Sequence, residues 1–439
     1  MGKEKPIVSI NKPFTLKGYW FLPDKPERTI AGVLTYTPGE RPLLELIGGF
    51  DEELDPMQRF ISNQRKAIVP AIHGLTADNK KVTLLDCHIF VSYNLSCPFS
   101  MESYRCSLLI YGHYINNDDD EWIMEAFVEL PTIEHFLSDR SFIFSHKEKG
   151  VINLITEPKD YNNCENIVTV EDVSCCLKNV SASNISGRNA SFTVCPVLRV
   201  KPENIISFNK LYRILFLYSE FLSIASLTPT HCSDISVFCP DEYQDINEKR
   251  FYHSIQIVFC QNICSEAPSV IDVLLRYADI KDIYPSIIAK WFEEDEKMGP
   301  IKRHLIEVIT DKRSYSSVKF LLMIQAVEGY YYRYVKDENI SLTKILNTII
   351  NNFNDVDAIS KIKWNVAALV DSRHYYSHFV PKTKKTKTLY GTEVAIATSE
   401  LRVLLICCML RIMGFDNARI NDTLNKCNSN LAKPLELSK

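Results

Sequence analysis

The C-terminal part of the fold is decided by one stretch, Phe320-Leu321-Leu322-Met323-Ile324-Gln325-Ala326-Val327-Glu328-Gly329-Tyr330-Tyr331. Its residues Phe320, Ile324, Val327 and Tyr331 recur at intervals of four, three and four positions, which places them on one face of an α-helix. We therefore expect an amphipathic helix whose apolar stripe faces a helical core.

Outward from this helix, the periodicity divides the chain in two. Helical patterns fill the region after about residue 270, and they predict helices over Ser269–Ala278, Tyr284–Phe292, Ile301–Thr310, Ser317–Tyr334, Ser341–Asn351, Asp357–Leu369 and Thr392–Met413. Gly414 follows the last of these, where a C-terminal glycine cap belongs. The pattern predicts an all-α bundle over residues 267–439.

Short strands separated by turns are the dominant pattern of residues 1–266. A hairpin is predicted by Ile30–Tyr36 and Leu43–Ile47, which flank the turn Thr37-Pro38-Gly39-Glu40. Further strands are predicted at Gly18–Leu22, Val82–Val91, Ser107–Tyr111, Trp122–Leu130, Phe142–Phe144, Ile152–Ile155, Ile167–Val170, Ser191–Val194, Val197–Val200 and Phe251–Cys260, with one helix at Phe208–Ala225. We expect an antiparallel sandwich or barrel-like domain here, and an α+β multidomain chain as a whole.

Composition limits the function classes. The 46% hydrophobic and 24% charged residues are typical of a globular protein, and a net charge of -4 means that any nucleic-acid binding must rest on a local patch. No stretch reaches about 18 uncharged apolar residues, and no signal peptide is recognisable, so we expect a cytoplasmic protein without membrane contact. The 14 cysteines are then expected to be reduced thiols.

One motif of the helical region carries chemistry, Asp371-Ser372-Arg373-His374-Tyr375-Tyr376-Ser377-His378-Phe379. Attack of a ribose 2′-OH on the adjacent phosphate needs a group that moves protons and a cation that holds the developing charge. Histidine does the first near neutral pH, and the planar guanidinium of arginine does the second. Arg373 and His378 are therefore the candidate pair for RNA cleavage, which needs no metal and no cofactor.

A lysine-rich segment follows the motif. Four lysines occur within six positions: Lys382, Lys384, Lys385 and Lys387. They are candidates for binding the RNA backbone electrostatically, with a solvated loop as the alternative interpretation.

The spacing of Arg373 and His378 restricts the geometry. Five residues at about 100° each put the two side chains about 140° apart on an ideal helix. Either the helix ends or kinks at the motif, or a second copy of the chain completes the site across a two-fold axis. The alternative is a pair of cations that cap a helix C-terminus, where they complement the helix dipole.

The motif resembles the R-x4-6-H signature of HEPN domains, in which the residue after Arg is typically Asn, Asp or His, as His374 is here. The stretch Phe320–Glu328 resembles the Glu-bearing helix of the ApeA-like HEPN branch. The stretches Gly18–Pro23 and Ile30–Leu34 look like the β-rich N-terminal domain of the same family. The resemblance covers nearly the whole chain.

This resemblance implies a function. HEPN domains are commonly metal-independent endoribonucleases that act as dimers, and ApeA-like proteins are bacterial anti-phage defence proteins of the abortive-infection type. Carried over, Arg373 and His378 are catalytic, His374 supports them, and Glu328 orients Arg373 or His378. The implied partners are RNA, with tRNA as the candidate target, a second copy bound through the HEPN domain, and a phage-derived trigger sensed by the β-rich domain.

Two other interpretations concern the function of the helical region and a zinc site. The helical region is alternatively a non-catalytic HEPN module that binds RNA or a protein and is regulated by a ligand-binding β-domain. A zinc site would draw on His231, Cys232, Cys239, Cys260 and Cys264, but their spacings do not match common zinc motifs. We therefore expect no metal site.

Overall fold

The computed structural model describes residues 8–50, 68–91, 101–137, 143–147, 151–155, 167–186, 189–262, 272–311 and 316–435. The chain forms two compact units. The β unit comprises Met1–Pro131, Pro158–Leu215 and His231–Ser265, and the helical unit comprises Thr132–Glu157, Phe216–Thr230 and Glu266–Lys439. The helical unit thus includes two segments that precede residue 266 in the sequence. The α+β fold class is confirmed.

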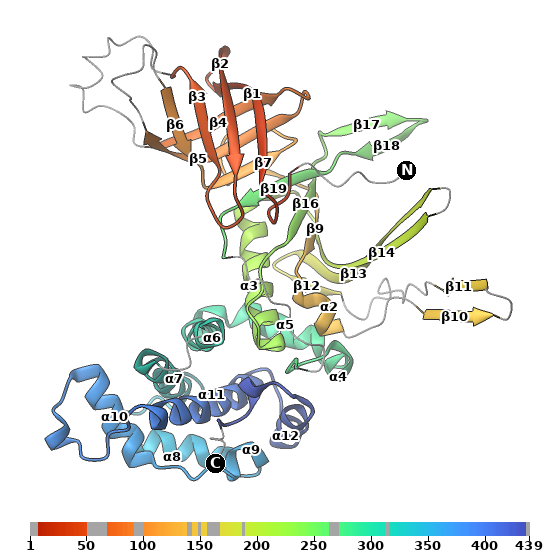
Figure 1. Cartoon of the computed structure of the whole chain (residues 1–439). Coiled ribbons are helices and arrows are strands. Elements are labelled where there is room, and N and C mark those ends of the chain that lie inside the picture. Colours follow the sequence, from red (N-terminus) through yellow and green to blue (C-terminus); the bar gives the residue numbers. More distant parts are fainter. Residues whose placement is uncertain are drawn as a thin grey trace, which may run out of the picture. The chain divides into compact units, whose positions relative to one another are not determined.

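Six antiparallel strands form a closed ring in the β unit (Figure 1). They are β1 (Phe14–Leu22), β2 (Lys25–Tyr36), β3 (Leu43–Ile47), β4 (Ile68–Thr76), β5 (Lys81–Val91) and β6 (Met101–Arg105). β6 pairs with both β3 and β5, which closes the ring. Trp20 is fully buried, and a Cβ on Gly74 opposite it would overlap its indole ring. Glycine is required at this position because only a backbone without a side chain leaves room for the ring.

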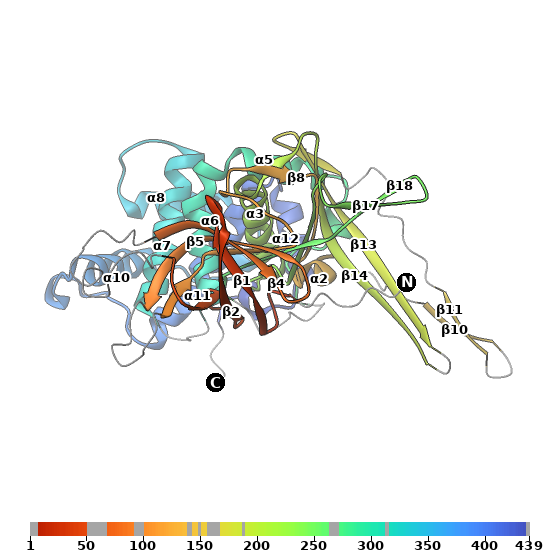
Figure 2. The ribbon, with the colours of Figure 1, turned by 90° about the horizontal axis from the view of Figure 1, so that it is seen from above.

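A second stretch of antiparallel sheet continues from β5. Its strands, in spatial order, are β7 (Leu108–Tyr111), β19 (Ile255–Phe259), β16 (Asp234–Phe238), β9 (Glu125–Glu129), β14 (Asn189–Pro202), β13 (Val173–Ser186) and β12 (Val168–Val170). The hairpin of β13 and β14 extends beyond the rest of the sheet (Figure 1 and Figure 2). Three smaller pairs are β8 (Glu121–Ile123) with β15 (Ile206–Ser207), β10 (Ile143–Lys147) with β11 (Val151–Ile155), and β17 (Tyr243–Ile246) with β18 (Lys249–Tyr252).

The helical unit is built around α11 (Thr392–Ile412), which packs against α6, α7, α9 and α12 (Figure 1). Its helices are α2 (Thr132–Leu137), the second half of α3 (Phe208–Ser226), α4 (Tyr277–Ile280), α5 (Tyr284–Glu293), α6 (Asp295–Thr310), α7 (Ser317–Tyr330), α8 (Leu342–Asn352), α9 (Asp357–Ser360), α10 (Val366–His378), α11 and α12 (Asn417–Lys426). Short π or 3₁₀ turns are Tyr331–Val335, Lys382–Lys384 and Asn430–Ala432. The predicted apolar stripe of α7 is confirmed, since Phe320, Ile324, Val327 and Tyr331 are all buried.

A buried cluster of charged residues ties α3 to α6 inside the helical unit. The Lys302 side chain is fully buried, and its Nζ lies 2.7 Å from Glu220 Oε2 and 2.8 Å from Asp295 Oδ1. Arg303 Nε also contacts Glu220 Oε1 at 3.0 Å. The Trp291 ring covers the ammonium, with 4.6 Å between Nζ and the ring centroid. A buried charge requires such pairing, because desolvation of an isolated ammonium costs several kcal/mol.

Two predicted helices are wrong in extent. Within Ser269–Ala278, whose first three residues lie outside the described ranges, α4 begins only at Tyr277, because the backbone N–H groups of Leu274 and Leu275 donate to Ala225 O instead of forming a helix. The predicted helix Asp357–Leu369 is interrupted after Ser360, and α10 begins after Asn365, whose side chain accepts from Ala368 N. The motif therefore lies within α10 and not between two helices.

Candidate active site

The motif occupies the C-terminal part of α10. The helix ends at His378, and Phe379 has left-handed backbone angles, with φ 52° and ψ 32°. The last carbonyl groups of a helix lack partners within the helix, and the partial negative charge there favours cations. His378 in the last turn is therefore at a position that suits positive charge, whereas Arg373 lies more than one turn before the helix end.

Arg373 and His378 contact each other directly. Arg373 Nη1 lies 2.9 Å from His378 Nε2. Since a guanidinium only donates hydrogen bonds, Nε2 is the acceptor in this contact, which fits the tautomer that carries its proton on Nδ1. The long, flexible arginine side chain spans the angle that separates the two residues on an ideal helix. The predicted break of the helix between the two residues is wrong, because α10 runs unbroken from Val366 to His378; completion of the site by a second copy stays a prediction.

Glu328 of α7 lies on the other side of the guanidinium. Its Oε2 is 3.6 Å from Arg373 Nη2, and each of the two side chains is 23% exposed. Among the described residues, Arg373 Nε has no hydrogen-bond partner. Such a partly exposed ion pair contributes at most about 1 kcal/mol to stability. Its effect is to orient the guanidinium, whose unpaired Nε is buried and whose two terminal nitrogens face His378 and Glu328.

His374 lies beside the pair. Its ring centroid is 5.8 Å from that of His378, with the two rings tilted by 34°. Burial is the main cause that lowers the pKa of His374, and the positive charges of Lys385 and Arg373 lower it further. His374 is therefore neutral at physiological pH and adds no cation to the site.

This lowered pKa predicts how stability depends on pH. The unfolded chain binds a proton at His374 more readily than the folded chain below about pH 6.5, so acidification through this range destabilises the fold. Burial lowers the pKa of His73, His231 and His304 in the same direction. We expect a lower melting temperature at pH 5.5 than at pH 7.5, and a smaller difference in His374→Gln. The control is His253→Gln, because His253 is exposed. If the melting temperatures at the two pH values differ as much in His374→Gln as in this control, His374 does not cause the pH dependence.

The lysine-rich loop is fastened to α10 by its polar residues. Leu389 N donates to Ser372 Oγ at 2.8 Å, and Tyr376 OH donates to Leu389 O at 2.9 Å. Asp371 accepts from Lys387 N at 3.3 Å and pairs with Lys385 Nζ at 3.3 Å. These contacts hold the loop along the helix that carries the Arg373–His378 pair.

The predicted RNA-binding lysines differ in their availability. Lys384 and Lys387 are exposed, whereas Lys385 is partly buried and its ammonium pairs with Asp371. The side chain of Lys382 lies outside the described residues. The anchoring roles of Asp371 and Ser372 did not follow from the sequence, because their partners are 16 and 17 residues further along.

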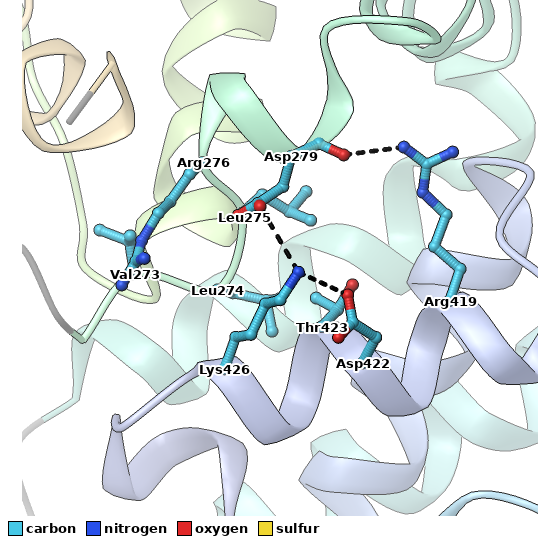
Figure 3. Close-up of a pocket in the computed structure, with 9 residues that line it drawn as sticks. All are labelled: Val273, Leu274, Leu275, Arg276, Asp279, Arg419, Asp422, Thr423 and Lys426. Carbon is cyan, nitrogen blue, oxygen red and sulfur yellow. Dashed lines mark hydrogen bonds and ion pairs between the residues drawn. The ribbon is translucent and has the colours of Figure 1, made fainter. Parts of the chain in front are cut away.

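A pocket elsewhere in the helical unit does not contain these residues. Figure 3 shows that its charged side chains compensate one another: Lys426 Nζ lies 2.7 Å from Asp422 Oδ2 and 3.6 Å from Asp279 Oδ1. Arg419 Nη2 donates to the carbonyl oxygen of Asp279 at 2.8 Å. Its volume of about 20 Å³ holds one water molecule at most. This pocket is too small for a substrate.

The β unit contains a larger cavity of about 240 Å³. It opens where β5 changes neighbours, pairing with β7 up to Leu85 and with β6 from His88 onward. Asp86 lies at this change with φ 50° and lines the cavity together with the aromatic residues Phe208, Tyr212 and Phe259. Its polar and aromatic lining would suit a small ligand, and its volume lies below the range of about 300–1,000 Å³ that is typical of such sites.

A thiol, an imidazole and a carboxylate also lie in series in the β unit. Cys239 Sγ is 3.7 Å from His113 Nε2, and His113 Nδ1 is 3.0 Å from Glu242 Oε1. Cys239 is fully buried, and burial raises the pKa of its thiol. A buried, protonated thiol is closed to substrates and is a poor nucleophile.

The residues considered for zinc do not assemble into a donor set. No three His, Cys, Asp or Glu side chains within the described part of the chain lie close enough to hold a metal ion, and Cys264 falls outside that part. None of the helices in the described ranges is both long and apolar enough to cross a membrane.

Two protein families match the chain. ApeA N-terminal domain 1 matches residues 15–291, and Apea-like HEPN matches residues 321–419. The second match contains α10 with Arg373 and His378, as well as Glu328 and the lysine-rich loop. No curated protein and no solved structure matches the chain.

Proposed function

We propose, from the premise that this chain belongs to the ApeA-like HEPN family, that its helical unit is a metal-independent endoribonuclease. HEPN domains are generally of the RNase type, and the ApeA type is associated with nuclease and defence roles. The observation that carries the proposal is the 2.9 Å contact between Arg373 Nη1 and His378 Nε2, with Glu328 behind it. It unites a phosphate-binding cation with an imidazole whose Nε2 accepts a hydrogen bond.

The contact suggests how substrate switches the site on. In the free protein, the basic nitrogen of His378 is occupied by an N–H of Arg373. A phosphate oxygen is a stronger acceptor for the guanidinium than a neutral imidazole, because it carries charge. Binding of the phosphate therefore draws the guanidinium toward it and frees Nε2 of His378.

The freed imidazole then moves the proton. Nε2 takes the proton of the ribose 2′-OH while the 2′-oxygen bonds to phosphorus, and the bond from phosphorus to the 5′-oxygen breaks. His378 returns the proton to the departing 5′-oxygen, so the products are a 2′,3′-cyclic phosphate and a 5′-OH end. Arg373 stabilises the charge on the non-bridging oxygens throughout. The proton count balances without any metal.

The basic loop supplies affinity that is independent of sequence. Lys384 and Lys387 are exposed beside the catalytic helix, where they attract the phosphate backbone. The reaction requires the 2′-OH, so the substrate is RNA, with tRNA as the proposed target. We also propose a cytoplasmic homodimer formed through the HEPN domain, an abortive-infection role, and a phage-derived trigger.

The β unit is proposed to restrain the nuclease, because an unrestrained RNase would damage its own cell. A fragment of residues 270–439 is a poor test of this restraint, since the helical unit also contains Phe216–Thr230 with Glu220, the partner of buried Lys302. The full chain is the appropriate protein for every assay.

The proposal is tested with matched oligonucleotides in EDTA. With lysate of phage-infected cells added as the source of the trigger, we expect the full chain to cut an RNA strand, and not to cut the same strand with 2′-deoxy or 2′-O-methyl nucleotides throughout. The physical reason is that both substitutions remove the nucleophile while keeping the phosphates. Loss of RNA cleavage in EDTA, with recovery on adding Mg²⁺, would contradict the metal-independent mechanism.

A second candidate function is supported by the cavity of about 240 Å³ in the β unit. In this alternative, the helical unit binds RNA or a protein without catalysis, and a small ligand in the cavity regulates it. The variants Arg373→Lys and His378→Ala would then leave the biological activity intact, whereas Tyr212→Ala in the cavity would change it.

A further inference from the structure

Phe379 is an unusual residue at the end of the catalytic helix. Its side chain is 86% exposed, the highest value among the exposed large hydrophobic residues of the described chain. Its φ of 52° makes it the one aromatic residue with a left-handed backbone in the described ranges. Leu227 shares such a backbone, but its side chain is buried.

The backbone conformation and the exposure of Phe379 each lower the stability of the folded chain. A residue with a Cβ is disfavoured in the left-handed region, and the position after a helix is usually taken by glycine. The exposed ring also forgoes the gain of burial. In the described part of the chain, no aromatic stacking or cation–π contact of Phe379 accompanies this arrangement. Stability of the fold therefore does not explain a phenylalanine here.

The position suggests what the ring does. Phe379 directly follows His378 in the chain, so its exposed ring lies at the end of the helix that carries Arg373 and His378. The lysine-rich loop begins just beyond it. Aromatic rings beside basic residues bind single-stranded nucleic acid, because the ring stacks on a base while the cations hold the backbone.

We propose that Phe379 is a stacking platform for a nucleobase next to the scissile phosphate, an inference that rests on the proposed function. Phe379 is in this account a positioning residue: it holds the strand so that its phosphate meets Arg373 and its 2′-OH meets His378. The occupant is a single strand of RNA, because the exposed Lys384 and Lys387 that follow Phe379 complement its phosphates.

The test uses a substitution that separates fold from binding. In Phe379→Gly the backbone strain is relieved, so the melting temperature should stay the same or rise. Affinity for a single-stranded RNA, measured by fluorescence anisotropy with a 2′-O-methyl strand that cannot be cut, should fall about 5- to 100-fold. Phe379→Trp should restore it, because any aromatic ring stacks. With cleavable RNA, KM should rise while kcat changes little.

Abasic RNA provides the matched control on the substrate. Removing the stacked base should weaken binding to the wild type as much as Phe379→Gly does, and should have no additional effect on Phe379→Gly. Equal affinity of wild type and Phe379→Gly would overturn the proposal. A loss of affinity that accompanies a change in oligomeric state, measured by light scattering, would overturn it as well.

The two proposals fail in distinguishable ways. Phe379-dependent binding without any cleavage, also with lysate of phage-infected cells added as the source of the trigger, supports the platform and refutes the nuclease. Cleavage that is insensitive to Phe379→Gly refutes the platform and leaves the nuclease in place. A wild-type chain that binds no RNA refutes the platform as well.

Discussion

His378→Ala is expected to reduce the rate of RNA cleavage by about 100- to 10,000-fold, the usual contribution of a proton-transferring side chain. Arg373→Lys should also reduce the rate of RNA cleavage, because an ammonium cannot pair two phosphate oxygens as the planar guanidinium does. The structure supports both expectations, since Arg373 Nη1 and His378 Nε2 are 2.9 Å apart at the end of α10.

The measurement is kcat and KM on a labelled RNA, with melting curves to show that the variants fold. His253→Ala and Arg250→Lys serve as matched controls, because both residues are exposed in the β unit. If the two residues only cap the helix, both variants will cut RNA at the wild-type rate and will melt at a lower temperature. That result would show that Arg373 and His378 have a structural role and not a catalytic one.

Lys302→Met is expected to cause the largest loss of stability, about 3 kcal/mol. The fully buried ammonium lies 2.7 Å from Glu220 Oε2 and 2.8 Å from Asp295 Oδ1. Its removal leaves two carboxylates without their buried counter-charge, with Arg303 as the remaining cation of the cluster. Breaking one side of a buried ion pair costs more than replacing the whole group by apolar residues.

The check is urea unfolding of the full chain, followed by a helix-sensitive signal. Exposed Lys361→Met is the control, and the double variant Lys302→Met with Glu220→Gln should recover part of the loss, because the unpaired charge on Glu220 is gone. A midpoint for Lys302→Met equal to that of Lys361→Met would show that the cluster does not stabilise this unit.

The helical core was largely predictable because its signal is local. The stripe on α7 follows from spacing alone, and α5, α8 and α11 lie close to their predicted positions. Segments held by distant contacts were not predictable in this way. β13 (Val173–Ser186) is rich in polar residues and is a strand because it pairs along its whole length with β14. The polar helix α12 was not predicted either, because Ile420 and Leu424 are the two residues that its buried face offers as an apolar signal.

The candidate site divides in the same way. The types and spacing of Arg373 and His378 indicated RNA cleavage. The family resemblance of the helix that carries Glu328 indicated that Glu328 lies beside Arg373 or His378. The direct contact between the pair depends on the conformations of two side chains on one unbroken helix, which the spacing alone does not give. The sequence also could not show that Asp371 and Ser372 anchor the basic loop, because a loop has no periodicity to place it.

The central claim is that Arg373 and His378 cleave RNA through its own 2′-OH. Its most direct test is the chemistry of the ends that the full chain leaves on RNA in EDTA, compared with His378→Ala. The account predicts 2′,3′-cyclic phosphate and 5′-OH ends with the wild type, and no new ends with the variant. Ends that carry a 5′-phosphate and a 3′-OH, or the same ends from His378→Ala, would contradict it.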